Sequence, residues 1–176
     1  LDYVRALAEE FGYAVAPTAT LGQAGERVSS TRIRAALADA DFDSAERLLG
    51  RPFEMAGRVQ HGQKLGRQLD APTANIALHR IRSPLHGVYA VNVSGGGLSD
   101  ALGVANVGVK PTIGESLEAT LEVHVLEGAP HLYGERLTVR FRHKLRDEQK
   151  FPSLDALKEG IAADKANAGA WLADHG

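Results

Sequence analysis

The pattern of apolar and polar positions divides the chain near residue 53. Before that point, apolar residues recur every three or four positions from Leu1 to Phe11, which predicts an amphipathic helix that Gly12 ends. A short strand is expected at Tyr13 to Ala16. Two helices are expected next, one from Ser29 or Ser30 to about Ala40 and one from about Ser44 to Gly50. This order is typical of the last unit of a doubly wound α/β fold.

After residue 53, short apolar alternations separated by glycine are typical of a β-barrel or sandwich. From Ala119 to Leu126 every second residue is apolar, so Glu122 and His124 project to the polar face. The glycines from Gly95 to Gly97 predict an exposed hairpin tip. The strands that we expect are Glu54 to Gln60, His86 to Ser94, Ala101 to Val107, Ala119 to Leu126 and Glu135 to Arg142.

The C-terminal part of the chain predicts a helix that follows a charged loop. Pro152 and Ser153 form a helix-start signal, and Leu154, Leu157 and Ile161 then share one face. The preceding residues, from Arg146 to Phe151, place several charges beside one aromatic side chain. This composition fits a solvated loop, and it fits equally a mobile flap that covers a ring-shaped ligand.

Composition narrows the class of protein. At 176 residues with 44% hydrophobic content, the chain can bury one core and a small appendage. It has no cysteine, which excludes disulfides and thiolate zinc sites and suits the cytoplasm, where we expect the protein. We expect no membrane partner, because no apolar run approaches the ~20 residues that span a bilayer.

A cationic segment stands out in a chain whose formal net charge is -2. Between Met55 and Arg82 the single acid is Asp70, whereas the basic residues are Arg58, Lys64, Arg67, Arg80 and Arg82. A local positive field in a near-neutral protein favours a small anionic ligand over a long polyanion. The loop at residues 61–67 lacks the GxxxxGK[ST] spacing, which excludes a Walker-type phosphate loop.

Three side chains are candidates for chemistry. Thr73 and Asn75 lie two residues apart, so in an extended segment they offer a hydroxyl and an amide oxygen on one side, as Mg²⁺ prefers. The alternative is a turn that satisfies its own backbone. Glu122 is either a general base for an alcohol or a solvated glutamate. His124 shares its face, but residues two apart on a strand are ~6.6 Å apart, which disfavours direct proton relay.

Seven motifs in register carry a resemblance to a known family. In order they are GRVQHGQKLGR, PTANI, HGVYAV, GVANVGVKPT, LEVHVLE, LYGERL and LRDEQKFPSLDALK. Together they resemble the riboflavin kinase module of the bacterial bifunctional riboflavin kinase/FAD synthetases, over about residues 53 to 165. The resemblance implies a mainly β fold, a small closed antiparallel Greek-key barrel with a C-terminal helix. It also implies Mg²⁺-dependent transfer of the ATP γ-phosphate to the ribityl hydroxyl of riboflavin, giving FMN and ADP.

The resemblance also implies roles for individual residues. Thr73 and Asn75 are similar to the magnesium and phosphate ligands of the PTAN motif, and Glu122 to the catalytic carboxylate. The ATP-binding residues that it implies are Gly62, Arg67, Thr73, Val125, Glu127 and Tyr133. The flavin-binding residues that it implies are Arg146, Gln149 and Phe151. The chain departs from the family at Leu69, Asp70 and Ala71, where a flexible glycine is missing and a negative charge is added beside the phosphates.

The first fifty residues resemble a different domain of the same enzymes. VSSTRIR is similar to the SSTxIR-type motif of the FMN adenylyltransferase domain, in which Ser29, Ser30, Thr31 and Arg34 would help bind ATP phosphates. The HxGH-like motif of that domain is absent from this sequence. We therefore expect residues 1–52 to be a short α/β C-terminal remnant of it, residues 53–176 to be the kinase barrel and its helix, and no FAD synthesis by this chain.

Two alternatives to a kinase fit a small barrel. An oligonucleotide-binding barrel is disfavoured, because only 6% of residues are aromatic and no Lys/Arg stripe follows the strands. A non-catalytic, flavin-responsive module would be expected to lack the PTAN pair or Glu122, and both are present. The partners that we expect are riboflavin, ATP, FMN and ADP, without nucleic acid.

Overall fold

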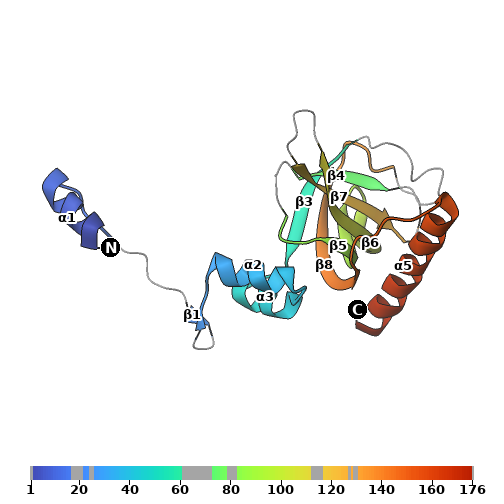
Figure 1. Cartoon of the computed structure of the whole chain (residues 1–176), viewed down its shortest axis with the longest axis horizontal. Coiled ribbons are helices and arrows are strands. Elements are labelled where there is room, and N and C mark those ends of the chain that lie inside the picture. The colour runs from blue at the N-terminus through green and yellow to red at the C-terminus, as the bar shows by residue number, and fades with distance from the viewer. Residues whose placement is uncertain are drawn as a thin grey trace.

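The computed structural model describes residues 2–16, 22–23, 26–60, 73–78, 83–111, 117–126, 128 and 131–175. Within these ranges the chain forms a β-barrel, a pair of short helices beside it and a long C-terminal helix (Figure 1). The helices are α1 (Asp2–Phe11), α2 (Ser30–Ala38), α3 (Phe42–Leu49) and α5 (Leu154–His175). The strands are β1 (Gly22–Gln23), β2 (Glu26–Arg27), β3 (Glu54–Gln60), β4 (Ala74–Ala77), β5 (Gly87–Gly95), β6 (Leu98–Pro111), β7 (Leu117–Val125) and β8 (Arg136–Arg146).

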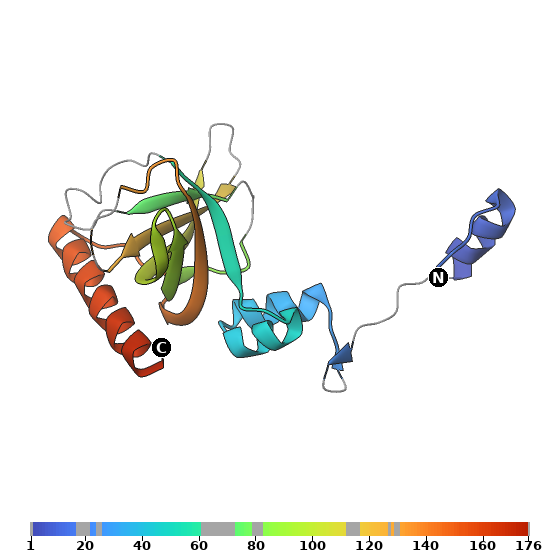
Figure 2. The ribbon, with the colours of Figure 1, turned by 180° about the vertical axis from the view of Figure 1, so that it is seen from behind.

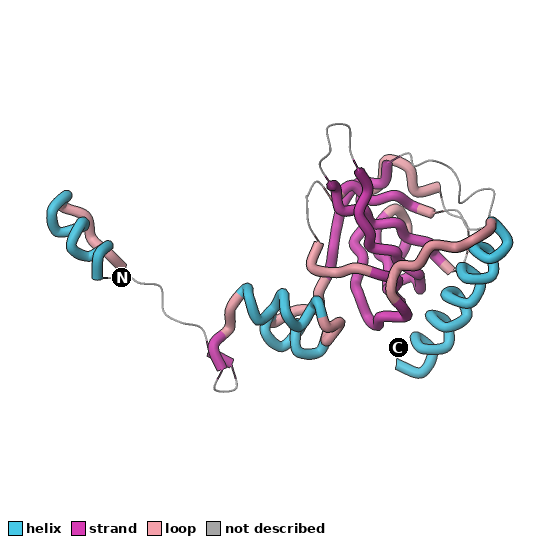
Figure 3. Tube along the Cα trace, in the orientation of Figure 1, coloured by secondary structure: helices cyan, strands magenta, loops and turns pink. Residues whose placement is uncertain are grey.

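Six strands close into an antiparallel barrel in the order β3-β4-β7-β6-β5-β8. Figure 3 shows these strands gathered in one part of the molecule, with the long C-terminal helix beside them. Strands β5, β6 and β7 follow one another as neighbours, while β4 lies beside β7, so the chain must cross from β4 to β5. This is a Greek-key connection. The fold class predicted from the sequence is therefore confirmed, including the C-terminal helix.

The barrel interior is built by the alternation seen in the sequence. Strand β3 alternates exposed and buried residues throughout, and β8 continues the same pattern across the β3–β8 pairing. The largest fully buried side chains come from several strands and include Met55, Tyr89, Leu121 and Leu137. Because one face of every strand is buried, a slip of one residue in register would turn this set of side chains to solvent.

The structure differs from the sequence prediction in five elements. Strands β1 and β2, of two residues each, were not expected. Strand β4 was not expected, because four residues after a proline give too short an alternation to recognise. The strand expected at Tyr13 to Ala16 is wrong: Gly12 has φ 71° and the Tyr13 N–H donates to the carbonyl of Ala8 at 2.8 Å, so this segment ends α1. Strand β6 extends beyond the expected Ala101 to Val107, because its whole length pairs with β5 or β7.

Helices α2 and α3 pack against the barrel core. The Ser29 hydroxyl accepts the Arg32 N–H at 3.3 Å at the start of α2, and the Asp41 carboxylate accepts the Ser44 N–H at 2.9 Å at the start of α3. The hydrogen bonds from Ser44 hold the pKa of Asp41 below its ordinary value. The Phe42 ring lies 6.0 Å from the Tyr89 ring and 6.2 Å from the Phe141 ring, so α3 contributes an aromatic residue to the barrel core.

Helix α5 covers part of the outer face of the barrel (Figure 2). Its start is fixed by Ser153, whose hydroxyl accepts the Ala156 N–H at 3.1 Å, as the sequence predicted. A second, smaller core forms beneath it from Ala90, Ala168 and Leu172. Among the described residues, the structure has no helix with the length and apolar character needed to cross a membrane.

Candidate active site

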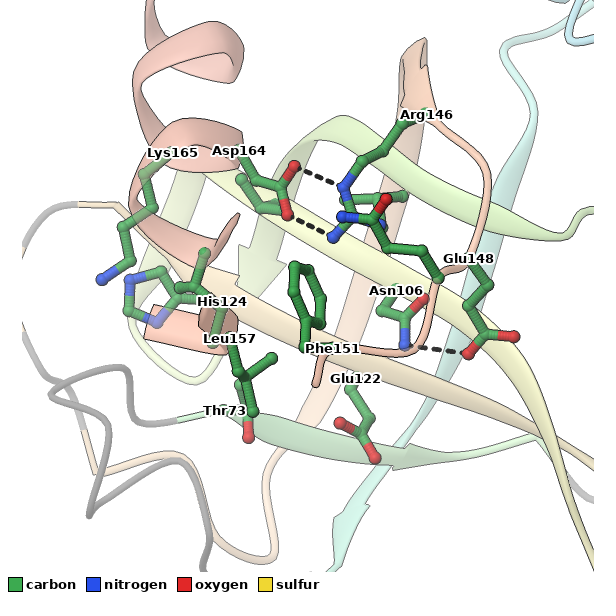
Figure 4. A pocket seen from close by; sticks show the side chains of 14 residues that line it. Thr73, Asn106, Glu122, His124, Arg146, Glu148, Phe151, Leu157, Asp164 and Lys165 are labelled. Atoms are coloured by element: carbon green, nitrogen blue, oxygen red, sulfur yellow. Dashed lines mark hydrogen bonds and ion pairs between the residues drawn. The ribbon is translucent and has the colours of Figure 1, made fainter. Parts of the chain in front are cut away.

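A cavity of about 280 Å³ lies on the outer face of the barrel, beneath the residues that join β8 to α5 (Figure 4). Its apolar wall is formed by Val88, Val104, Phe151, Leu157 and Ile161. Its polar wall is formed by the residue before β4 and by residues of β6, β7, the end of β8, the connection and α5 (Thr73, Asn106, Glu122, His124, Arg146, Glu148, Gln149, Asp164 and Lys165). An apolar surface with a few convergent polar groups is typical of a small-molecule site.

A row of polar side chains crosses three strands at one side of this cavity. In the register of the barrel, Asn75 of β4 lies opposite Glu122 of β7, and Asn106 of β6 lies opposite Glu122 on its other side. Directly opposite residues in antiparallel strands have Cβ atoms about 5 Å apart. Glu122 is thus flanked by two amides, because the inward positions of β7 are taken by the buried Leu121 and Val123.

Glu122 has one charged partner among the described residues. Lys110, near the end of β6, places its Nζ 2.5 Å from Oε1 of Glu122. The Lys110 side chain is 49% exposed and that of Glu122 is 29% exposed, so solvent screening leaves this pair little weight in stability. Its effect is local: it fixes one oxygen of Glu122 and directs the carboxylate along the outer face.

Thr73 and Asn75 lie on the same, outward side of the chain. The residues that alternate with them, Ala74 and Ile76, are buried and point inward. Thr73 lines the cavity described above. Asn75 lines a neighbouring cavity of about 390 Å³, together with Gln60, Lys110 and Thr120. The two candidate magnesium ligands therefore line neighbouring cavities, Thr73 the one that Glu122 also lines and Asn75 the other.

The connection between β8 and α5 is held to the helix by Arg146. Its guanidinium donates to both carboxylate oxygens of Asp164, Nε to Oδ1 at 2.8 Å and Nη2 to Oδ2 at 2.7 Å. The same guanidinium lies 5.5 Å from the centre of the Phe151 ring. Phe151 packs closely on Gly160 of α5, where a side chain would collide with the ring. The three residues that the sequence linked to a flavin (Arg146, Gln149 and Phe151) thus line one cavity with Thr73 and Glu122.

A second ion pair anchors the start of this connection. Lys144 donates to Asp147 at 2.7 Å, and this hydrogen bond raises the pKa of Lys144 and lowers the pKa of Asp147. A lowered carboxyl pKa stabilises the folded state above the unfolded pKa and loses that effect as the pH falls through the folded value. A raised lysine pKa stabilises the folded state below the unfolded pKa, and this stabilisation is lost as the pH rises through the folded pKa. The pair therefore stays ionised throughout the neutral range.

Replacing Lys144 by methionine should raise the pKa of Asp147 toward its ordinary value, because the hydrogen bond from the lysine is the largest cause of its depression. Carboxyl-carbon NMR titration of the two proteins measures the change. Lys158→Met, at an exposed lysine of α5, is the matched control and should leave the Asp147 titration where it is. A pKa of Asp147 that stays depressed in Lys144→Met would show that another group holds the carboxylate.

Other residues named from the sequence lie elsewhere. Val125 points into the barrel core and is buried, so its side chain does not reach the outer cavity. Tyr133 follows β7 and is partly buried, with its ring 5.5 Å from the His131 ring. Gly62, Arg67 and Glu127, and the departures at Leu69, Asp70 and Ala71, lie outside the described residues. Thr73 is the one member of the ATP set that lines the cavity among the residues described.

Three residues of the site were not singled out in the sequence. Asn106 occupies an outward position of a predicted strand, which the alternation alone could have indicated. Asp164 shares the helical spacing of Leu157 and Ile161, so a carboxylate on an otherwise apolar face was a detectable signal. Lys110 lies beyond the predicted end of its strand, and no pattern in the sequence linked it to Glu122.

The fold and the cavity together define a small closed barrel with a candidate site for a small molecule on its outer face. The cavity has an aromatic residue, an arginine that is already ion-paired and one carboxylate in a row of amides. A family model described as "Flavokinase: Riboflavin kinase" matches residues 49–172. The chain therefore belongs to the riboflavin kinase family, and the resemblance drawn from its motifs is confirmed.

Similar proteins agree with this assignment. The chain is 55% identical over 172 residues to the bifunctional riboflavin kinase/FMN adenylyltransferase of Pseudomonas fluorescens, a match that covers 98% of this chain and 55% of that protein. A crystal structure of a Streptococcus pneumoniae protein described as a macrolide-efflux protein has a TM-score of 0.74 and 32% identity, covering 95% of this chain and 55% of that one. The riboflavin kinase of Trypanosoma brucei has a TM-score of 0.50 and 26% identity, covering 69% of this chain and 80% of that one. The chain spans about half the length of the curated relatives that it matches.

Proposed function

We propose that this chain catalyses transfer of the ATP γ-phosphate to the ribityl hydroxyl of riboflavin, giving FMN and ADP. The observation that carries the proposal is that one cavity is lined by Glu122 and Thr73 and also by Arg146, Gln149 and Phe151. The first pair suits proton removal and phosphate binding, and the other three suit a flavin ring. Membership of the riboflavin kinase family supports this division of the cavity.

Glu122 acts as the general base in this proposal. Phosphoryl transfer demands positioning and charge stabilisation more than covalent chemistry, so one carboxylate near the attacking alcohol is sufficient. Lys110 contacts Oε1 of Glu122, and Oε2 is the oxygen that we assign to the substrate hydroxyl. In the register of the sheet, Asn75 and Asn106 are the residues directly beside Glu122 on the two neighbouring strands.

Thr73 and Asn75 are the residues that we assign to Mg²⁺. Their hydroxyl and amide oxygens project from the same side of the chain, next to a carboxylate, and hard oxygen donors are the ligands that this ion takes. Among the described residues there is no cluster of three or more His, Cys, Asp or Glu that could form a complete metal site. Mg²⁺ prefers few protein ligands plus substrate phosphates, whose charge the bound ion would neutralise.

Phe151 and Arg146 hold the isoalloxazine ring. The ring of Phe151 is fixed against Gly160, and the guanidinium of Arg146 is fixed by Asp164, so both groups are positioned before a ligand enters. Pre-organised side chains lower the entropic cost of binding a planar ligand. The apolar residues Leu157 and Ile161 complete the wall against which the ring lies.

The activity of the whole protein is a further part of the proposal. The Pseudomonas relative is named for a second activity, FMN adenylyltransferase, and the Ser29 to Arg34 segment lies within the match to it. We assign that activity to the full-length protein, with residues 1–52 belonging to the adenylyltransferase domain and residues 53–176 to the kinase. Use of ATP as co-substrate supports a cytoplasmic location.

Incubated with riboflavin, ATP and Mg²⁺, the chain should form FMN and stop there. A helix start such as that of α2 can hold phosphate oxygens, but adenylyl transfer also needs sites for the adenine and for FMN, which we assign to no residue of this chain. Chromatography of the reaction separates riboflavin, FMN and FAD, and omission of Mg²⁺ is the control. Absence of FMN would overturn the kinase assignment, and FAD formed at an enzymatic rate would overturn the division of activities.

A further inference from the structure

One polar atom in the cavity has no partner. The side-chain oxygen Oδ1 of Asn106 is fully buried, and no hydrogen-bond donor reaches it. It is the only such side-chain atom among the described residues. Buried acceptors in native proteins nearly always have a partner, so an orphaned one in a ligand cavity indicates a donor that arrives with the ligand.

The orientation of the Asn106 amide is fixed by Glu148. Nδ2 of Asn106 donates to Oε1 of Glu148 at 3.3 Å, and Figure 4 shows the amide nitrogen turned toward that carboxylate. A flipped amide would set two oxygen acceptors against each other, so Nδ2 and not Oδ1 must face Glu148. The Glu148 carboxylate in turn packs over Gly108, where a side chain would displace it. The unpartnered atom is therefore an acceptor, and it requires a hydrogen-bond donor.

The position of Asn106 selects among the donors of the substrate. Asn106 lies directly opposite Glu122 in the β6–β7 register, about 5 Å away between Cβ atoms. If Glu122 receives the primary hydroxyl of the ribityl chain, the secondary hydroxyls of that chain lie within a few atoms of it. The ring N–H of the flavin belongs at the other end of the ligand, near Arg146 and Phe151. With the primary hydroxyl at Glu122, a secondary ribityl hydroxyl is thus the donor that lies nearest to Asn106.

We propose that Oδ1 of Asn106 accepts a hydrogen bond from one secondary ribityl hydroxyl, and so makes the site specific for a polyol chain. The inference rests on the proposed function, since it takes riboflavin as the ligand. A site built to hydrogen-bond a substrate hydroxyl rejects an analogue that lacks the hydroxyl, because its own polar group is then left unpaired. The Asn106 amide, next to the general base, therefore recognises the ribityl chain that carries the reacting hydroxyl.

The test compares riboflavin with its 2′-, 3′- and 4′-deoxy analogues. Binding is measured without ATP, by quenching of flavin fluorescence, so that the result does not depend on phosphoryl transfer. The unmodified chain should bind one of the three analogues roughly tenfold more weakly than riboflavin. Asn106→Ala should bind riboflavin roughly tenfold more weakly and should bind that analogue as tightly as it binds riboflavin. The ratio of its affinity for riboflavin to its affinity for each of the other two analogues should be the same as in the unmodified chain.

Asn92 of β5 supplies the matched control. It is a buried asparagine on the adjacent strand, but its Oδ1 accepts from Arg142 at 3.0 Å and its Nδ2 donates to the Asp100 carbonyl at 3.2 Å. Asn92→Ala should lower the melting temperature and leave the discrimination among analogues as it is. Thermal unfolding of both variants separates loss of folding from loss of recognition.

The outcomes distinguish this inference from the proposed activity. If the unmodified chain binds all three analogues as tightly as riboflavin, or if Asn106→Ala keeps the original discrimination, the role of Asn106 is overturned even where FMN forms. If discrimination disappears in Asn106→Ala but no FMN forms with ATP and Mg²⁺, the role of Asn106 stands and the kinase assignment falls. The measurement on the unmodified chain does not depend on whether the variant folds.

Discussion

Replacing Glu122 by glutamine should lower turnover roughly 10²-fold or more, with riboflavin affinity nearly unchanged. Glutamine keeps the size of the side chain and one oxygen for Lys110, but it cannot accept the proton of the attacking alcohol. A 10²-fold loss corresponds to about 2.7 kcal/mol of transition-state stabilisation. Initial rates of FMN formation give the turnover, and fluorescence titration gives the affinity.

Glu54→Gln is the matched control for this variant. Glu54 is an exposed glutamate at an outward position of β3, opposite Arg140 in the register, and it lines neither the flavin cavity nor the neighbouring cavity that contains Asn75. The same loss of charge at this position should change turnover by less than roughly threefold, as expected for an exposed carboxylate outside the reaction. Equal activity of Glu122→Gln and the unmodified chain would end the assignment of Glu122 as the base.

Replacing Thr73 and Asn75 together by alanine should weaken magnesium–ATP roughly 10- to 100-fold and riboflavin much less. Both side chains project from the outward side of the β4 segment, next to Glu122, so we expect them to face the metal and the phosphates. Calorimetric titration with each ligand measures the two affinities separately. The ratio of the two losses is the informative quantity, because a general loss of folding would lower both.

Thr138→Ala provides the control for removal of a threonine hydroxyl from an outward strand position. Thr138 lies on β8, where it pairs with Ala56 of β3 and Ser94 of β5, and it lines none of the cavities described here. This variant should retain both affinities. A double variant at Thr73 and Asn75 that loses riboflavin and keeps magnesium–ATP would show that the β4 segment is structural and that the ion is held elsewhere.

Strand alternation predicted most of the barrel, because a buried face with period two leaves a strong signal. Five strands were expected at nearly the right positions, and the C-terminal helix began at its capping serine. Strand β4 was missed because its four residues are too few to show a period, although its motif was the one interpreted chemically. The prediction of a strand at Tyr13 was wrong because the backbone N–H of Tyr13 donates to the Ala8 carbonyl at the end of α1 and is not available to a neighbouring strand.

The candidate site was predicted less evenly, because motifs identify residues but not their neighbours. Thr73, Glu122, Arg146 at the end of β8, and Gln149 and Phe151 of the β8–α5 connection were named from the sequence, and they line one cavity. The ion pair between Lys110 and Glu122 depends on a diagonal contact across two strands, which requires the register. The partner of Arg146 is Asp164, eighteen residues along the chain and on a helix, so its role became visible only once α5 was placed.

The aromatic contact between α3 and the barrel bears on where a self-sufficient folding unit begins. Phe42 packs against Tyr89 and Phe141, and Ala45 is buried in the same core, so the hydrophobic interior extends upstream of the first residue that could take part in kinase chemistry. An excised fragment that started at residue 53 would open one end of the barrel and expose aromatic rings, a surface prone to aggregation. A fragment that keeps this core complete therefore begins upstream of the kinase residues and includes α2 and α3.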